Sequence, residues 1–285
     1  MAKEHIAFIG LGSMGKPMAM NLCKAGYPLT VVDLNPTPGS ELVALGARSA
    51  DSPRQAAEEA DLVIVMVWNG NQTKDVMLGD RGALASLKKG GIVLLMNTIE
   101  PEVIRTIAAA AAERGVIVLD APVSGAQVRA QSGTLTIMVG GDQAAYETCR
   151  PILAAMGNEI FYLGGIGAGI AGKLVNNILV AVHMMATAEL IRLGARVGVN
   201  PDLLVDMLKT ATGSSNIVRA WKKIDRAFEV GEYFRRGGVW ELMQKDIHLA
   251  LDFAKKQNVA IPVSNLAAKL YDSLDFSPGK NPFAP

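Results

Sequence analysis

Glycine residues near the start of the chain have the spacing of a phosphate-binding turn. The apolar run Ile6–Ile9 predicts a buried strand, and Gly10, Gly12 and Gly15 follow it just before a helical pattern. In such a turn the glycines allow tight bending, close approach of a pyrophosphate and close packing of helix on strand, while the helix N-terminus attracts the phosphates. The sequence therefore predicts a dinucleotide site made by Gly10, Leu11, Gly12, Ser13, Met14 and Gly15.

A second apolar run supports this interpretation because it ends in an acidic residue. Leu29–Val32 predicts the next strand, and Asp33 follows it about 20 residues after the glycines, where a carboxylate can bind the ribose hydroxyls. A 2′-phosphate would place like charges together, and no arginine directly follows Asp33. The predicted cofactor is therefore NAD, and NADP is less favoured.

The elements that position these residues alternate between strand and helix. Further strands are predicted over residues 62–67, 92–96, 116–119, 134–139 and 160–163, with helices between them. This alternation is typical of a doubly wound parallel sheet, in which ligands bind beyond the carboxyl ends of the strands. We expect one crevice to be lined by Gly10, Asp33, Val67-Trp68-Asn69, Thr98 and Asp120.

The composition changes after Gly164-Gly165, where a domain boundary is predicted. Residues 167–196 contain no proline, so they predict one helix of about 45 Å. Helices are also expected over 201–209, 216–228, 241–256 and 264–274, and an irregular segment over 276–285. The predicted fold class is α/β. An N-terminal Rossmann domain over residues 1–164 is followed by an all-helical substrate and oligomerisation domain over 165–285, joined by the long helix.

Composition and charge limit the class of protein. The 285 residues include 28 basic and 27 acidic side chains, which gives no basic footprint for nucleic acid. The longest apolar stretch, Leu174–Ala188, contains Asn176, Asn177 and His183 and is shorter than the ~20 residues of a membrane span. The first strand begins by Ile6, which leaves no room for a signal peptide. We expect a cytoplasmic enzyme with neither nucleic acid nor membrane as a partner.

Cysteine and histidine residues do not suggest a metal or a nucleophilic triad. Cys23 and Cys149 lie on apolar helical faces and are expected to be buried thiols in a reducing compartment. His5, His183 and His248 are scattered, and no spacing typical of metal ligands accompanies them. We expect no metal site.

Three further stretches, taken with the glycine turn, resemble motifs of the β-hydroxyacid dehydrogenase family. They are Asp120–Gly125 (Asp-Ala-Pro-Val-Ser-Gly), Gly167–Lys173 with Asn177 after it, and Lys245-Asp246. The family includes 3-hydroxyisobutyrate dehydrogenase and tartronate semialdehyde reductase. The resemblance implies NAD(P)-dependent interconversion of a small anionic β-hydroxy acid and its semialdehyde, by a homodimer or homotetramer.

By this resemblance Lys173 is the catalytic residue. Hydride transfer to an aldehyde leaves an alkoxide that needs a proton, which an ammonium group can supply. Asn177, four residues later and on the same face of a helix, would orient the substrate or Lys173. The alternatives are a solvated lysine at a helix start and an amide that only packs helices.

The resemblance also implies a substrate and a nicotinamide subsite. Ser124 and Gly125 offer a hydroxyl and backbone N–H groups to a carboxylate, and Lys245 would lie near the nicotinamide and the substrate. The alternative for Lys245 is a surface lysine paired with Asp246. The residues expected on the cofactor side are Val67, Trp68 and Thr98.

Several positions depart from the family pattern. Ala126 stands where a second glycine is usual, Trp68 replaces a proline, and Gly238 replaces a phenylalanine whose role Trp240 could take. The family's usual final helix is also missing.

Residues 125–133 are mostly small in relatives, but here they include Arg129 and two glutamines. A guanidinium suits a second anionic group on the substrate, such as a carboxylate or sulfonate, through two parallel hydrogen bonds. The alternative is that Arg129 lies on a solvated loop.

Two other functions are compatible with the fold. One is reduction of imines or other carbonyls, against which Lys173 and the Ser124-Gly125 carboxylate site argue. The other is a non-catalytic nucleotide-binding scaffold, and the presence of Lys173 argues against that.

Overall fold

The computed structural model describes residues 3–229 and 239–274, and the chain divides into two compact units, residues 1–173 and 174–285. The division falls within a long helix, α8, which spans Ala168–Arg196.

A single mostly parallel sheet forms the centre of the first unit. Its strands run in the spatial order β3-β2-β1-β4-β5-β6-β8-β7, with β9 paired to β8. All pairs from β3 to β6 are parallel, whereas β8 is antiparallel to β6 and β7. The strands are β1 (Ile6–Ile9), β2 (Leu29–Val32), β3 (Arg48–Ser49), β4 (Leu62–Val65), β5 (Ile92–Leu95), β6 (Ile117–Asp120), β7 (Val123–Ser124), β8 (Leu135–Gly140) and β9 (Gly157–Gly164).

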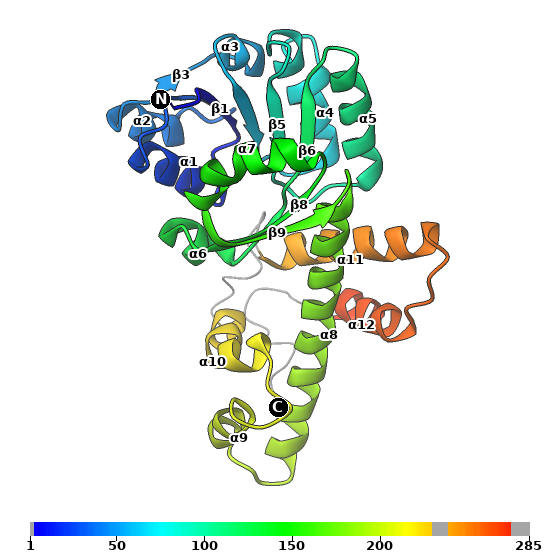
Figure 1. Ribbon diagram of the computed structural model, residues 1–285. Helices are drawn as coiled ribbons and strands as arrows, with labels where there is room; N and C mark the ends of the chain where they lie inside the picture. The colour runs from blue at the N-terminus through cyan, green and yellow to red at the C-terminus, as the bar shows by residue number, and fades with distance from the viewer. Residues whose placement is uncertain (1–2, 230–238, 275–285) are drawn as a thin grey trace. The chain divides into compact units, whose positions relative to one another are not determined.

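Helices follow the strands, as the alternating sequence pattern predicts. Strands β1, β2 and β4 are buried along their whole length, which requires cover on both faces and explains their unbroken apolar sequences. Figure 1 shows α7 in front of the sheet and α4 and α5 beside β5 and β6. The helices are α1 (Gly15–Lys24), α2 (Thr37–Ala44), α3 (Pro53–Ala57), α4 (Gly70–Leu78), α5 (Pro101–Ala112), α6 (Ala126–Ser132) and α7 (Gln143–Ala154), with a 3₁₀ turn at Ala83–Ala85.

The strand order reverses at β1, which lies between β2 and β4. Connections leave β1 toward β2 on one side, and the later strands β4 and β5 lie on the other. Ligands of doubly wound sheets bind beyond the carboxyl ends of the strands at such a reversal. The segments after β1 and β4 are therefore the ones that the fold makes available to a ligand.

The second unit is helical. It contains the greater part of α8, followed by α9 (Pro201–Leu208), α10 (Asn216–Glu229), α11 (Val239–Lys256) and α12 (Pro262–Ser273). Their buried faces form a separate apolar core that includes Met184, Ile191, Trp221, Ile247 and Tyr271. The segment 276–285, expected to be irregular, lies outside the described residues.

Helix α8 is long and apolar enough to cross a membrane by length and composition alone. In its most apolar 18-residue window, 44% of the helix is buried inside the protein, and core helices of soluble proteins pass the same test. Figure 1 shows α8 as one continuous helix.

Candidate active site

The glycine turn after β1 has the backbone that a pyrophosphate requires. Gly10 has a φ of +97°, and a Cβ there would clash with the carbonyl oxygen of Met66, which follows β4. Gly12 is exposed, and a Cβ there would meet nothing within 4 Å. Helix α1 begins at Gly15 without a side-chain cap at Met14, so its first N–H groups are available to an anion. These residues fit the phosphates of a dinucleotide.

Asp33 joins the end of β2 to the glycine turn. Its carboxylate accepts hydrogen bonds from the N–H of Leu11 at 2.5 Å and from the N–H of Asn35 at 2.8 Å. The side chain is half-buried, and both bonds fix its position beside the turn. A carboxylate held there suits the ribose diol of NAD.

Asn97 connects the two loops that were expected on the nicotinamide side. It is 3% exposed, and its amide nitrogen donates to the carbonyl of Val67 at 3.0 Å and to Thr73 Oγ1 at 2.8 Å. Val67, Trp68 and Thr98 are half-buried on these loops. Sequence reasoning missed Asn97, although a polar residue at the end of an apolar strand, directly before Thr98, was the available signal.

The side chain of Asn69 has a local structural role. Its Oδ1 accepts the N–H of Gln72 at 2.9 Å and caps helix α4. Asn69 was expected to line the crevice, but its side chain instead caps a helix.

Asp120, at the carboxyl end of β6, binds the beginning of α8. It is fully buried, and its carboxylate accepts the N–H groups of Gly167 and Ile170, both at 2.7 Å. Burial raises the pKa of this carboxyl, against the opposing effect of the backbone N–H bonds. Both oxygen atoms of the carboxylate bind backbone N–H groups at the start of the helix, so Asp120 positions α8.

Lys173 follows this anchored helix start by one turn. A Cβ on Gly169 would clash with the carbonyl oxygen of Met138 and lie 2.6 Å from that of Asp120, so the helix face that carries Gly169 packs on the strand ends. Lys173, four residues later on that face, is only 9% exposed. The structure thus contradicts the alternative of a solvated lysine.

Ser124 and Arg129 are both neighbours of Thr136. Ser124 is paired with Thr136 across the β7–β8 ladder, and Arg129 Nη1 donates to Thr136 Oγ1 at 3.3 Å. The aliphatic stem of Arg129 covers Gly125, where a Cβ would lie 2.7 Å from the Cβ of Arg129. Arg129 belongs to the short helix α6 and is half-buried, so it does not lie on a solvated loop.

Ala126, which replaces the family's second glycine, has a φ of +56°. The left-handed region costs an alanine about 1–2 kcal/mol. Ala126 therefore holds a backbone conformation that a glycine would adopt at lower cost.

Asn177 and Lys245 are both held by Asp246 in the second unit. Asp246 is 1% exposed, and it accepts the amide of Asn177 at 2.5 Å and the ammonium of Lys245 at 2.6 Å. The ion pair between Lys245 and Asp246, which the alternative interpretation of Lys245 predicted, is therefore present. Lys245 lies in α11 with a side chain that is 21% exposed.

Both cysteines are free thiols, and they differ in burial. Cys149 is buried, which raises the pKa of its thiol to about 12, whereas Cys23 is half-buried. Gly238 lies outside the described residues, as does the side chain of Trp240. Among the described residues, no group of three or more His, Cys, Asp or Glu side chains could hold a metal ion.

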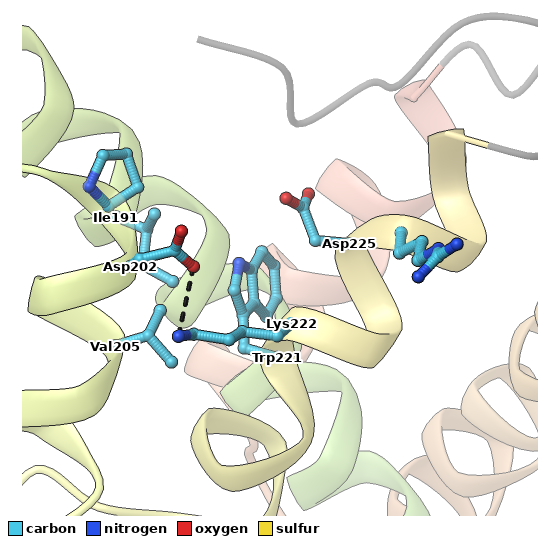
Figure 2. Close-up of a pocket in the computed structure, with 8 residues that line it drawn as sticks. Ile191, Asp202, Val205, Trp221, Lys222 and Asp225 are labelled. Carbon is cyan, nitrogen blue, oxygen red and sulfur yellow. Dashed lines mark ion pairs between the residues drawn. The ribbon is translucent and has the colours of Figure 1, made fainter.

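A pocket of about 210 Å³ in the second unit is separate from these residues. It is lined by Asp202, Val205, Trp221 and Lys222, among others, and Figure 2 shows the ion pair that joins Lys222 to Asp202 at 3.2 Å. None of the predicted site residues lines it.

Comparison with known proteins identifies relatives of the whole chain. Residues 5–164 match the NAD-binding domain of 6-phosphogluconate dehydrogenase, and residues 167–281 match the NAD-binding family of NADP-dependent 3-hydroxyisobutyrate dehydrogenase. These matches confirm the predicted fold class and the predicted cofactor, NAD.

Named relatives agree with the family matches. An NAD-dependent L-serine dehydrogenase of Pseudomonas aeruginosa is 42% identical over 94% of this chain and 91% of its own. A 2-(hydroxymethyl)glutarate dehydrogenase of Eubacterium barkeri is 36% identical over 94% and 88%. The structure of Mycobacterium tuberculosis 3-hydroxyisobutyrate dehydrogenase with L-serine has a TM-score of 0.83, at 32% identity over 95% and 93% of the two chains.

Imine reductases are more distant. The enzyme of Streptomyces aurantiacus is 19% identical with a TM-score of 0.67, which shows a shared fold alone.

Proposed function

Because the chain belongs to the β-hydroxyacid dehydrogenase family, we propose that it oxidises a small β-hydroxy acid to its semialdehyde with NAD, or catalyses the reverse reduction. One observation carries the assignment to this chain's own residues. Lys173 is buried in the first turns of α8, and Asp120 fixes the start of that helix to the same sheet edge that bears the glycine turn and Thr98.

The residues divide the chemistry between them. Gly10, Gly12 and the start of α1 would hold the phosphates of NAD, and Asp33 would hold its ribose. Bound there, the cofactor would supply the hydride acceptor for oxidation of the carbinol carbon of the acid. Lys173 takes the hydroxyl proton during oxidation and returns it to the alkoxide oxygen during reduction. Ser124 binds the substrate carboxylate.

A finer proposal concerns the substrate class. Arg129 lies beside Ser124, around Thr136, and its guanidinium can bind a second carboxylate or a sulfonate. The name of the Eubacterium barkeri relative specifies a glutarate, which is a dicarboxylate. We infer that the preferred β-hydroxy acid of this chain carries two anionic groups.

The proposal extends to the state of the protein in solution. We infer a homodimer or homotetramer, because large apolar side chains such as Leu190, Leu193 and Leu203 are 59–68% exposed in the second unit. We infer a cytoplasmic location because Cys23 and Cys149 are free thiols, which suits a reducing compartment.

A substrate panel tests the function. The protein is mixed with NAD or NADP and with 3-hydroxyisobutyrate, glycerate, L-serine or 2-(hydroxymethyl)glutarate, and the NADH or NADPH absorbance band is followed. We expect oxidation of at least one acid, and a preference for NAD of about tenfold or more, since ~1.4 kcal/mol suffices for that factor. Oxidation of none of them, with reduction of a cyclic imine instead, would favour the imine reductase alternative. Equal efficiency with both cofactors would contradict the role given to Asp33.

A further inference from the structure

Asp246 is a buried carboxylate to which the proposed mechanism gives no role. Its side chain is 1% exposed, and each of its two oxygen atoms accepts a hydrogen bond. Oδ2 accepts the side-chain amide of Asn177 at 2.5 Å, and Oδ1 accepts the ammonium of Lys245 at 2.6 Å. Burying a carboxylate is costly unless its hydrogen bonds are made, so this arrangement strongly restrains both partners.

The chemistry of the carboxylate determines which way the amide of Asn177 points. An ionised carboxylate only accepts hydrogen bonds, so the NH₂ group of Asn177 must face Asp246 and its oxygen must face away. Asn176 supports the same orientation, because its own amide nitrogen donates to Asn177 Oδ1 at 2.9 Å. An amide oxygen has two lone pairs, so Asn177 Oδ1 can accept one hydrogen bond more.

We infer that Asp246 is a positioning residue that makes Asn177 a hydrogen-bond acceptor in the active site. An acceptor at this position suits a hydroxyl hydrogen of the substrate or an ammonium group such as that of Lys173, four residues earlier in α8. It does not suit a substrate carboxylate, which is itself an acceptor. We therefore assign Asn177 the role of accepting a hydrogen bond from the reacting hydroxyl of the substrate or from the ammonium group of Lys173. This assignment rests on the proposed function.

Two variants of α11 give a first kinetic test of the inference. Asp246→Asn keeps the size of the side chain, but an amide can present either oxygen or NH₂ to Asn177. We expect kcat/KM for the hydroxy acid to fall about 10- to 100-fold, the worth of one charge-assisted hydrogen bond. Asp252→Asn, which removes an exposed carboxylate from the same helix, should leave it unchanged.

The combination of variants separates positioning from a general structural role. Asp246 also binds Lys245, so the comparison is made with Lys245→Met in every variant. If Asp246 acts through Asn177, then Asp246→Asn combined with Asn177→Ala should be no slower in this background than Asn177→Ala alone. Costs that multiply, with an unchanged melting temperature, would overturn the inference. So would full activity of Asp246→Asn.

A measurement on the wild-type protein needs neither activity nor a folded variant. The side-chain NH₂ protons of Asn177, assigned in ¹H–¹⁵N spectra, should exchange with D₂O far more slowly than those of Asn258, which is exposed. Equal exchange rates would overturn the inference. Slow exchange in a protein that oxidises no hydroxy acid would leave the contact with Asp246 intact and show that the proposed function is the part that failed.

Discussion

At the scale of single residues, the ammonium group of Lys173 is the feature on which the proposed chemistry depends. Lys173→Met keeps an unbranched apolar stem in the buried site but removes the group that moves the proton. We expect turnover to fall about 10²- to 10⁴-fold, the usual worth of a positioned acid or base. Single-turnover absorbance measurements would give this rate.

The binding of NADH, followed by its fluorescence, should be unchanged in Lys173→Met, because no residue of the glycine turn is altered. Lys74→Met, an exposed lysine of α4, is the matched control. Near-native turnover of Lys173→Met at neutral pH would rule out Lys173 as the acid.

Arg129 gives a second prediction at this scale. Arg129→Ala removes the guanidinium beside Ser124, so KM for a β-hydroxy acid with two anionic groups should rise by the equivalent of ~1.5–3 kcal/mol of charge-assisted bonding. The KM for 3-hydroxyisobutyrate should change little, because it has one carboxylate. Gln127→Ala, on the exposed side of the same helix, serves as control. An unaltered substrate profile in Arg129→Ala would mean that the second anion, if any, binds elsewhere.

At the scale of elements, the long apolar runs could be read directly from the sequence. The predicted strands at Ile6–Ile9 and Leu29–Val32 have the same bounds in the structure, and the long helix begins at Ala168, within one residue of its predicted start. Strand β7 and helix α6 were not predicted. Strand β7 has only two residues and depends on its pairing with β8, so it has no periodic pattern. Contacts across the chain are also invisible to such patterns: Asp120 and Gly167 are 47 residues apart.

The cap on α8 gives a prediction about stability. Asp120→Asn keeps one acceptor oxygen but turns an NH₂ group toward the N–H of Gly167 or Ile170. One buried amide then lacks a partner, which should lower the free energy of unfolding by about 1–3 kcal/mol at neutral pH. Urea unfolding followed by circular dichroism would measure it. Asp142→Asn, at the cap of α7, removes a charge from a helix start whose carboxylate is bound to one N–H group, so it should cost less.

The pH dependence of the Asp120 effect follows from the raised pKa of that carboxyl. A folded-state pKa above the unfolded value means that the folded protein favours the protonated form. Stability from this source is full below the unfolded pKa and is lost as pH rises through the folded pKa. Asparagine does not titrate, so the deficit of Asp120→Asn should be larger at pH 4 than at pH 8. A deficit that grows with pH would contradict burial as the dominant effect.

At the scale of the whole molecule, the residues of the family motifs are shared between the two units. The glycine turn, Ser124 and Lys173 belong to residues 1–173, whereas Asn177 and Lys245 belong to residues 174–285. The sequence could indicate these residues because their motifs are local. It could not indicate that Asp246 holds both Asn177 and Lys245, because 69 residues separate Asn177 from Asp246 and neither pattern depends on the other.

Exposed apolar side chains at the end of α8 predict association between copies of the chain. Leu190 and Leu193 of α8 are 59% and 60% exposed, and Val197, directly after the helix, is 70% exposed. Three apolar side chains so close together in the sequence are an unfavourable surface for an isolated chain in water. If copies associate through these side chains, Leu193→Glu should lower the mass measured by light scattering from a multiple of 30.1 kDa toward 30.1 kDa. Arg192→Glu, which places the same side chain on the neighbouring exposed position, should keep the wild-type mass. A wild-type protein that already has the mass of one chain would contradict the proposed oligomer, and an unchanged mass for Leu193→Glu would exclude these side chains as its contact.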